Sequence, residues 1–304
     1  MMRCTTLHRA ASHISQWPTA GERPREETPM FDFTGKAVLV TGGGAGIGRA
    51  TAEAFKAAGA RVATIEIDPA RAEEARAALG DDALVVVGDV TDAAAVADLA
   101  AQVDAAFGGL DVLVNNVGDF LMLAKPFDQL SDAEIARLYA TNLGQVFGVT
   151  RAMIPLLRRK GAGGSIVSVS SIEGFRGIPN CAVYAACKAG LTGFTQSLAL
   201  ELGPGGIRVN LIAPETTDTP QVPVSLMIPE EHRRHIPNWI PLGRFGTPQD
   251  MASGILFLAS PHAAWITGTA LHIDGGALAA AGWYRDPRGT WTNLPVLSGN
   301  GLDF

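Results

Sequence analysis

Residues 37–48 read AVLVTGGGAGIG, an apolar run that passes directly into a glycine-rich turn. The run predicts a buried strand, and the residues after it predict a helix that begins within the turn. Glycines at these positions permit a tight turn, close approach of the backbone to a pyrophosphate and close packing of helix on strand. The amino end of the helix adds unpaired N–H groups and partial positive charge. The stretch therefore predicts a dinucleotide site at Gly42, Gly46, Ile47 and Gly48, with a plain glycine turn as the alternative.

Outward from this stretch, apolar strand-like runs alternate with alanine-rich helical segments. Six more strands are expected, in RVATIEI, ALVVV, DVLV, SIVSVS, IRVNLIA and ALHID, and helices are expected near 47–58, 69–78, 92–107, 131–158, 182–202 and 248–259. Such alternation predicts a parallel sheet with helices on both faces. The expected fold class is α/β: a doubly wound, parallel, seven-stranded sheet of the Rossmann type, forming one domain over residues 30–276.

Three segments do not follow this alternation. Residues 1–29 lack apolar periodicity, so we expect them to be disordered, with an ordered arm as the alternative. Residues 214–245 are rich in proline and too long for a plain connection, which predicts a lid over a substrate site. Residues 277–304 carry aromatic side chains in a glycine-rich tail, which predicts packing on the body or on a neighbouring subunit.

Composition excludes several classes of function. The chain has 304 residues, of which 47% are hydrophobic and 18% charged, as in soluble globular proteins. Its net charge of −6 argues against nucleic acid as a partner. No stretch has the length of a membrane span or the pattern of a secretory signal, so we expect no membrane partner and a cytoplasmic location. Cys4, Cys181 and Cys187 lack metal-ligand spacing, so no metal site is predicted and the thiols are expected to be reduced.

Polar residues at later strand ends extend the predicted cofactor site. Glu66 ends the second strand, 18 residues after Gly48, where a carboxylate would bind the ribose hydroxyls and repel a 2′-phosphate. This position favours NAD over NADP. Asp68 is the competing acid, and capping of the next helix is the alternative role for either one. The ends of the third and fourth strands add further cofactor-binding candidates, namely Asp89, Val90, Asn116 and Gly118.

Tyr184 and Lys188 lie four residues apart in YAACK, so both side chains would leave one face of the expected helix. An ammonium beside a phenol stabilises the phenolate and lowers the tyrosine pKa, which suits a proton-transferring group. The spacing therefore predicts acid–base chemistry at Tyr184.

Together, TGGGAGIG, NNVG, the spacing of Ser171, Tyr184 and Lys188, and IRVNLIAP resemble the short-chain dehydrogenase/reductase family across about residues 30–276. The resemblance implies that Ser171 holds the substrate oxygen and that Tyr184 transfers the proton. It implies that Lys188 binds the nicotinamide ribose and lowers the tyrosine pKa, and that Asn142 positions a proton-relay water.

The same resemblance implies further contacts. Cofactor-binding residues would include Tyr184 and Lys188 again, and Pro214, Thr217 and Thr219. Homodimers or homotetramers would form through helices 131–158 and 182–202, with the last strand as a second contact.

The resemblance also places a substrate pocket, lined by Asp119, Glu173, Phe175, Cys181 and Glu215. Glu215 stands where the family usually has glycine, so the pocket is expected to be unusual. Up to three carboxylates there would favour hydroxyl-rich or cationic substrates, and solvent-facing or helix-capping glutamates are the alternative.

Three functions are compatible with these residues. The leading hypothesis is an NAD-dependent dehydrogenase that interconverts a cyclic or polyhydroxylated secondary alcohol and its ketone. An NADPH-dependent reductase of 3-oxoacyl thioesters is the alternative among enzymes. A non-catalytic, dinucleotide-binding regulator is the alternative of another class, disfavoured by the intact Ser171, Tyr184 and Lys188.

Overall fold

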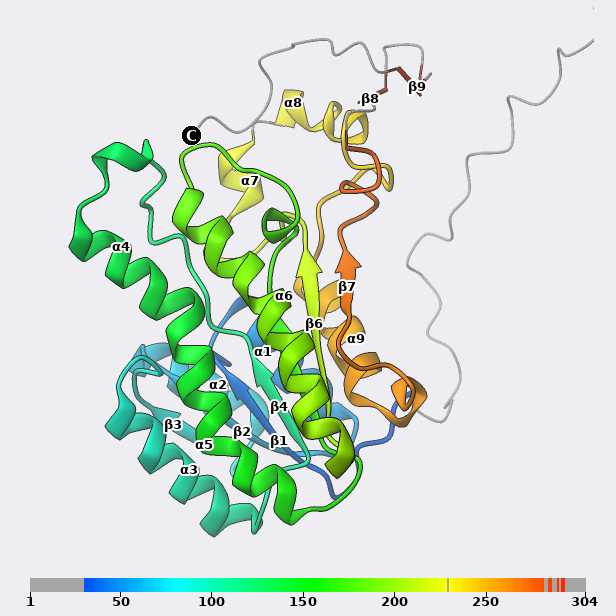
Figure 1. Ribbon diagram of the computed structural model, residues 1–304. Helices are drawn as coiled ribbons and strands as arrows, with labels where there is room; N and C mark the ends of the chain where they lie inside the picture. The colour runs from blue at the N-terminus through cyan, green and yellow to red at the C-terminus, as the bar shows by residue number, and fades with distance from the viewer. Residues whose placement is uncertain (1–29, 229, 282–283, 286–288, 290, 293–304) are drawn as a thin grey trace, which may run out of the picture. The chain divides into compact units, whose positions relative to one another are not determined.

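The computed structural model describes residues 30–304 except 229, 282–283, 286–288, 290 and 293–304. A seven-stranded parallel sheet runs through it in the order β3-β2-β1-β4-β5-β6-β7 (Figure 1). The strands are β1 (Ala37–Thr41), β2 (Arg61–Glu66), β3 (Leu84–Val87), β4 (Val112–Asn115), β5 (Ser165–Val169), β6 (Arg208–Pro214) and β7 (Ala270–Ile273). The fold class predicted from the sequence is confirmed.

The helices that connect the strands cover both faces of the sheet. They are α1 (Gly46–Ala57), α2 (Pro69–Leu79), α3 (Ala93–Phe107), α4 (Asp132–Tyr139), α5 (Gln145–Arg159), α6 (Ala182–Leu202), α7 (Val224–Met227), α8 (Glu230–Arg233) and α9 (Pro248–Ala259). Val38 and Val40 of β1 pack in one core with α1 and α9, whereas Leu39 packs in a second core with α3, α5 and α6. The alternation of side chains along a strand thus supplies a core on each face.

The order of the strands reverses between β1 and β4, which pair directly through Leu39 and Leu113. In open α/β sheets, ligands bind at such a reversal, outside the carboxyl ends of the strands. The glycine-rich turn follows β1, and the sequence NNVG begins at Asn115, the last residue of β4. The topology therefore brings both predicted cofactor motifs to one crevice.

The helix predicted over 131–158 is interrupted in the structure. A π-helical turn, Ala140–Gly144, lies between α4 and α5, and it contains Asn142. Sequence periodicity does not reveal such a turn, which adds one residue to the local repeat and is frequent at functional sites.

The segment predicted as a lid, residues 214–245, contains two short helices, α7 and α8, that lie beyond the carboxyl ends of β6 and β7 (Figure 1). Val224, Ile228 and Ile236 of this segment are buried in a third core cluster, together with Ala277 at the start of the predicted tail. The tail also holds an unpredicted antiparallel pair, β8 (Tyr284–Arg285) and β9 (Trp291–Thr292).

Two expectations concern residues that the structure does not describe. The disorder expected for 1–29 lies outside the described residues, and so do residues 293–304 of the tail. Among the helices that are described, none combines the length and the apolarity needed to cross a bilayer.

Candidate active site

The turn after β1 is built from glycines in conformations that other residues rarely adopt. Gly42 and Gly46 have φ angles of 66° and 54°. A Cβ on Gly48 would lie 2.1 Å from the carbonyl oxygen of Gly42, so only glycine allows α1 to begin this close to β1. Thr219 lies on the other side of the turn, since a Cβ on Gly46 would be 3.3 Å from its side chain.

The amino end of α1 suits a phosphate group. Its N-cap is Ala45, which offers no side-chain cap, and its first turn contains no acidic residue. The free N–H groups at this end and the positive end of the helix dipole are the features that bind pyrophosphate. The four predicted residues from Gly42 to Gly48 therefore fit a dinucleotide cofactor.

Glu66 and Asp68 have different roles in the structure. Asp68 caps α2, accepting a hydrogen bond from the N–H of Ala70 at 2.8 Å. Glu66 is 6% exposed, and its two carboxylate oxygens accept from the N–H groups of Gly44 and Asp68, each at 3.1 Å. Its carboxylate thus lies directly beside the glycine-rich turn, as the ribose-binding role requires.

Asn116 holds the two cofactor motifs together. Its Nδ2 donates to the carbonyl oxygen of Thr41 at 2.9 Å, and its N–H donates to the Thr41 hydroxyl at 3.0 Å. Asp89 accepts from the N–H of Thr91 at 2.8 Å, and Val90 is buried against β2 and α3. The side chains of Asn116 and Val90 therefore support the crevice, and their predicted contact with a cofactor stays a prediction.

Ser171 and Tyr184 come together above the end of β5. Ser171 is the residue from which the short helical turn Ile172–Gly174 begins, and its hydroxyl accepts from the N–H of Glu173 at 3.2 Å. The same hydroxyl hydrogen-bonds the phenol of Tyr184, which favours the phenolate. The structure thus brings together two groups that are 13 positions apart in the sequence.

The lowering of the Tyr184 pKa expected from Lys188 stays a prediction, because burial dominates the pKa of this tyrosine in the chain by itself. Burial raises the pKa of Tyr184 above its usual range, the Ser171 hydrogen bond opposes this, and the charges of Glu173 and Asp119 raise the pKa further. The Lys188 ammonium lies 5.6 Å from the centroid of the tyrosine ring and donates to the carbonyl oxygen of Val169 at 2.9 Å. It therefore contacts the end of β5 rather than the phenol oxygen.

Lys188 is a buried cation with unused donors. It is 2% exposed, and burial lowers its pKa to about 8. Of its three N–H groups, one has a partner among the described residues, the carbonyl of Val169. The remaining donors fit the ribose hydroxyls of a nicotinamide nucleotide.

Asn142 lies in the π-helical turn and is fully buried. Its Oδ1 accepts from the N–H of Asp119 at 2.9 Å, and its Nδ2 donates to the carbonyl oxygens of Asp119 at 2.7 Å and Leu138 at 3.0 Å. The side chain thus fixes the loop after β4 against the π-helical turn. Its predicted role in placing a water stays a prediction.

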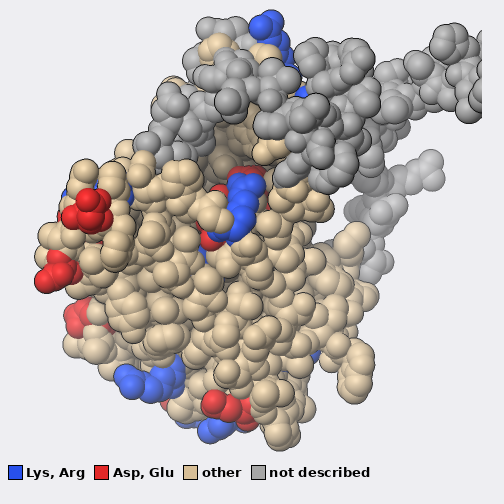
Figure 2. All heavy atoms as spheres, turned by 45° about the horizontal axis from the view of Figure 1, so that its top comes forward, with Lys and Arg blue, Asp and Glu red and all other residues tan. Residues whose placement is uncertain are grey.

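The carboxylates expected to line the substrate pocket are all engaged within the chain. Asp119 accepts from the N–H of Leu121 at 2.6 Å. Arg176, which the sequence analysis did not single out, bridges Glu173 at 2.9 Å and Glu215 at 2.8 Å. Figure 2 shows acidic and basic side chains side by side on the face where the strands end. The carboxylates of Glu173 and Glu215 are therefore not free in solvent, since each forms an ion pair with Arg176.

The other predicted residues surround this cluster. Phe175 packs edge-on against His272 of β7, with ring centroids 4.6 Å apart. Cys181 is the N-cap residue of α6 and is buried, which raises the pKa of its thiol. Pro214 ends β6, and the hydroxyl of Thr217 donates to the carbonyl oxygen of Glu215 at 2.9 Å. Contacts of these residues with a substrate or cofactor stay predictions.

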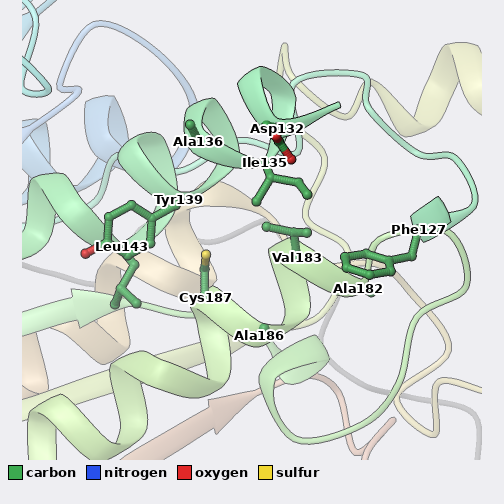
Figure 3. Close-up of a pocket in the computed structure, with 10 residues that line it drawn as sticks. All are labelled: Phe127, Asp132, Ile135, Ala136, Tyr139, Leu143, Ala182, Val183, Ala186 and Cys187. Carbon is green, nitrogen blue, oxygen red and sulfur yellow. The ribbon is translucent and has the colours of Figure 1, made fainter. Parts of the chain in front are cut away.

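A separate apolar groove lies on the outer side of α4 and α6. It has a volume of about 620 Å³ and contains none of the residues Ser171, Tyr184 and Lys188. Figure 3 shows the ten residues that line it, namely Phe127, Asp132, Ile135, Ala136, Tyr139, Leu143, Ala182, Val183, Ala186 and Cys187. The groove is distinct from the crevice at the strand ends.

Comparison with known proteins agrees with the fold and the motifs. A family profile described as enoyl-(acyl carrier protein) reductase matches residues 42–277. The 3-oxoacyl-(acyl-carrier-protein) reductase of Escherichia coli is 37% identical over 249 residues, which cover 81% of this chain and 98% of the relative. Levodione reductase of Leifsonia aquatica is 35% identical over 263 residues, which cover 83% of this chain and 98% of the relative.

Two solved structures are similar over most of their length. The 3-ketoacyl-(acyl-carrier-protein) reductase of Brucella melitensis, complexed with NADH, superposes with a TM-score of 0.73 at 35% identity, covering 81% of this chain and 99% of that chain. A short-chain dehydrogenase of Burkholderia cenocepacia, in complex with NADP, has a TM-score of 0.73 at 37% identity, covering 80% of this chain and 98% of that chain.

Proposed function

This chain belongs to the short-chain dehydrogenase/reductase family, and we propose that it interconverts a ketone and a secondary alcohol with Tyr184 as the proton-transferring group. The observation that carries the proposal is the hydrogen bond between Ser171 and Tyr184, with the buried Lys188 one helical turn further along α6. A nicotinamide dinucleotide, when bound, supplies or accepts the hydride.

The residues of the chain supply the rest of the chemistry. In the direction of reduction, the Tyr184 hydroxyl donates its proton to the carbonyl oxygen, and the Ser171 hydroxyl donates a hydrogen bond to the same oxygen. The names of the similar proteins, which are reductases, support reduction as the favoured direction, in contrast to the dehydrogenase expected from the sequence.

The substrate class that we propose is a 3-oxoacyl thioester, which was the alternative in the sequence analysis. Two kinds of support favour it over a polyol. The Escherichia coli relative and the Brucella melitensis structure are both named as reductases of such acyl-carrier substrates. The pairing of Glu173 and Glu215 with Arg176 also removes the free carboxylates that pointed to a polyol or a cation.

A cyclic ketone is a second candidate substrate. The support is the levodione reductase of Leifsonia aquatica, whose identity to this chain, 35%, is close to that of the acyl-carrier reductases. A panel that contains a 3-oxoacyl thioester, a cyclic diketone and a polyol, followed by NADH absorbance, separates the candidates.

For the cofactor, we propose NAD(H) over NADP(H). The buried Glu66 carboxylate supports this, because it would repel a 2′-phosphate. Position 44 is a glycine, so it carries no basic side chain that could neutralise the phosphate; a Cβ there would lie 2.5 Å from Glu66 Oε2 and 2.8 Å from the Cβ of Arg71. Of the two similar structures, one contains NADH and the other NADP, so they do not favour either cofactor. The proposal therefore rests on the residues of this chain.

We also propose that residues 214–245 form a lid and that the chain assembles as a homodimer or homotetramer. Thr219 lies beside Gly46, so the segment begins next to the cofactor crevice. For assembly, the support is the apolar groove between α4 and α6, where Phe127 and Tyr139 are 61% and 47% exposed. A second copy of α4 and α6 would bury these side chains.

The experiment that tests the catalytic proposal is Tyr184→Phe. Loss of the phenol should lower kcat by about 10²–10⁴-fold, because that is the usual contribution of a general acid. Binding of NADH, followed by fluorescence, should stay within about twofold of wild type. Tyr139→Phe, in the outer groove, is the matched control. Retention of more than about a tenth of kcat in Tyr184→Phe would overturn the proposal.

A further inference from the structure

Arg176 joins the segment that follows β5 to the segment that follows β6. Its Nη2 lies 2.9 Å from Glu173 Oε1 and 2.8 Å from Glu215 Oε2, and its Nε lies 3.3 Å from Glu173 Oε2. The exposed fractions of the three side chains are 32% for Arg176, 14% for Glu173 and 7% for Glu215. The guanidinium is thus the most accessible member of a largely buried ion-pair cluster.

The carboxylates of this cluster are satisfied by the chain itself. Besides Arg176, Glu215 accepts from the N–H of Thr216 at 2.7 Å and from its hydroxyl at 2.9 Å. Two carboxylates and one guanidinium give the cluster a net charge of −1. Burial alone would lower the pKa of Arg176, but the hydrogen bond and charge of Glu173 and the charge of Glu215 raise it, so the guanidinium stays charged. A buried carboxylate that lost this partner would need another cation or would have to take up a proton.

The cluster borders the reacting groups. The N–H of Glu173 donates to the Ser171 hydroxyl at 3.2 Å. The charge of Glu173 also acts on Tyr184, as do those of Asp119 in the loop after β4 and Cys181 at the start of α6. The Lys188 ammonium lies 5.6 Å from the centroid of the tyrosine ring. A substrate whose carbonyl oxygen lies between Ser171 and Tyr184 therefore has this cluster as its neighbour.

We propose that Arg176 is a specificity-determining residue: by pairing with Glu173 and Glu215, it reduces the negative charge of the pocket wall from −2 to −1 and so weakens the preference for cationic over neutral carbonyl compounds that two unpaired acids would create. The inference rests on the proposed function, because it places the substrate beside Ser171 and Tyr184. It differs from the expectation from the sequence alone, in which the acids would favour hydroxyl-rich or cationic substrates.

The proposal predicts that two substitutions by glutamine change the preference for a cationic substrate in opposite directions. Arg176→Gln removes the positive charge but keeps an amide that can donate to the carboxylates, so the net charge of the cluster falls from −1 to −2. Glu215→Gln keeps Arg176 and removes one negative charge, so the net charge rises to zero. A cation in the pocket should gain from the first substitution and lose from the second.

The test uses two 3-oxo esters of matched shape, the cation acetoacetylcholine and its neutral analogue 3,3-dimethylbutyl acetoacetate, in which carbon replaces the quaternary nitrogen. The quantity measured is the kcat/KM of the cationic ester divided by the kcat/KM of the neutral ester, each from the loss of NADH absorbance. The ratio should rise about tenfold in Arg176→Gln and fall several-fold in Glu215→Gln. The matched control is Arg159→Gln, which removes the partner of Asp104 on the outer surface of α5 and should leave the ratio unchanged.

The outcomes separate this inference from the proposed function. If the wild type reduces the neutral ester and the ratio is unchanged in both variants, the specificity role of Arg176 is wrong while the catalytic proposal stands. A change of the same sign in both variants would also overturn it, since loss of packing rather than charge would then explain the effect. Activity of Tyr184→Phe equal to wild type would overturn the proposed function, and this inference with it.

Discussion

Lys188 approaches Gly118 so closely that a Cβ on Gly118 would lie 2.6 Å from the lysine Nζ. The same Cβ would be 3.2 Å from Asn142 Oδ1. Gly118 is therefore the point at which α6, the π-helical turn and the loop after β4 meet. Glycine is required there by the space that the ammonium occupies, and not by the backbone conformation.

This contact predicts the effect of Gly118→Ala. The added methyl group should push the Lys188 ammonium away from its place at the end of β5 and lower kcat by about 10- to 100-fold, since displacements of about 1 Å have such effects. Gly148→Ala, in α5, is the matched control because no atom lies within 4 Å of the Cβ it would add. The control should keep wild-type kcat and gain up to about 1 kcal/mol in the free energy of unfolding. Equal kcat values for both variants would contradict the role assigned to the contact.

Cofactor choice should depend on the charge of Glu66. The wild type should have a higher kcat/KM with NADH than with NADPH, and Glu66→Gln should shift the ratio toward NADPH by about tenfold, or about 1.4 kcal/mol. Asp68→Asn is the control, because asparagine also caps a helix and Asp68 faces the start of α2. A wild-type preference for NADPH in steady-state kinetics would refute the assignment of Glu66.

Burial of Lys188 should make stability depend on pH. Its pKa is about 8 in the folded chain and 10.5 ordinarily, so between these values the unfolded chain binds more protons than the folded chain. The free energy of unfolding should therefore rise with pH across this interval, by up to about 3 kcal/mol from this group alone.

The measurement is urea unfolding of wild type and Lys188→Met at pH 7.5 and pH 9.5. Because the charges of Cys187 and Lys188 shift each other's pKa, the same pair is also compared in a Cys187→Ala background. The free energy of unfolding of the wild type, minus that of Lys188→Met, should be larger at pH 9.5 than at pH 7.5. A difference that does not change with pH would show that folding does not lower the pKa of Lys188.

Much of this architecture follows from local patterns. The strands could be predicted because apolar runs such as Val38 to Val40 are short, uninterrupted and followed by turn residues. Tyr184 and Lys188 could be paired because four positions make one helical turn. The position of Glu66 could be predicted because β2 ends one strand away from the glycine-rich turn.

The remaining features depend on contacts between distant parts of the chain. The π-helical turn at Asn142 is fixed by hydrogen bonds to Asp119, 23 positions earlier. Arg176 has no motif around it, and its partner Glu215 lies 39 positions later, so the sequence suggested free carboxylates where the fold forms an ion-pair cluster. No local pattern reports such pairings, because they are set by which strands become neighbours.

Assembly through the groove between α4 and α6 can be tested on one side chain. Ala186 is exposed on α6 and lines the groove, and Figure 3 shows it near Val183 and Cys187 of the same helix. In a dimer formed by this face, Ala186→Arg would place a long charged side chain in a groove whose lining residues other than Asp132 are uncharged, so sedimentation at micromolar concentration should shift toward the monomer. Ala77→Arg, at an exposed position of α2, is the matched control and should sediment like wild type. Because Ala186 lies outside the crevice that holds Ser171 and Tyr184, any loss of activity in Ala186→Arg should follow protein concentration. If the wild type sediments as a monomer, the proposed assembly is wrong. If the wild type is a dimer that Ala186→Arg does not change, the interface lies on another face.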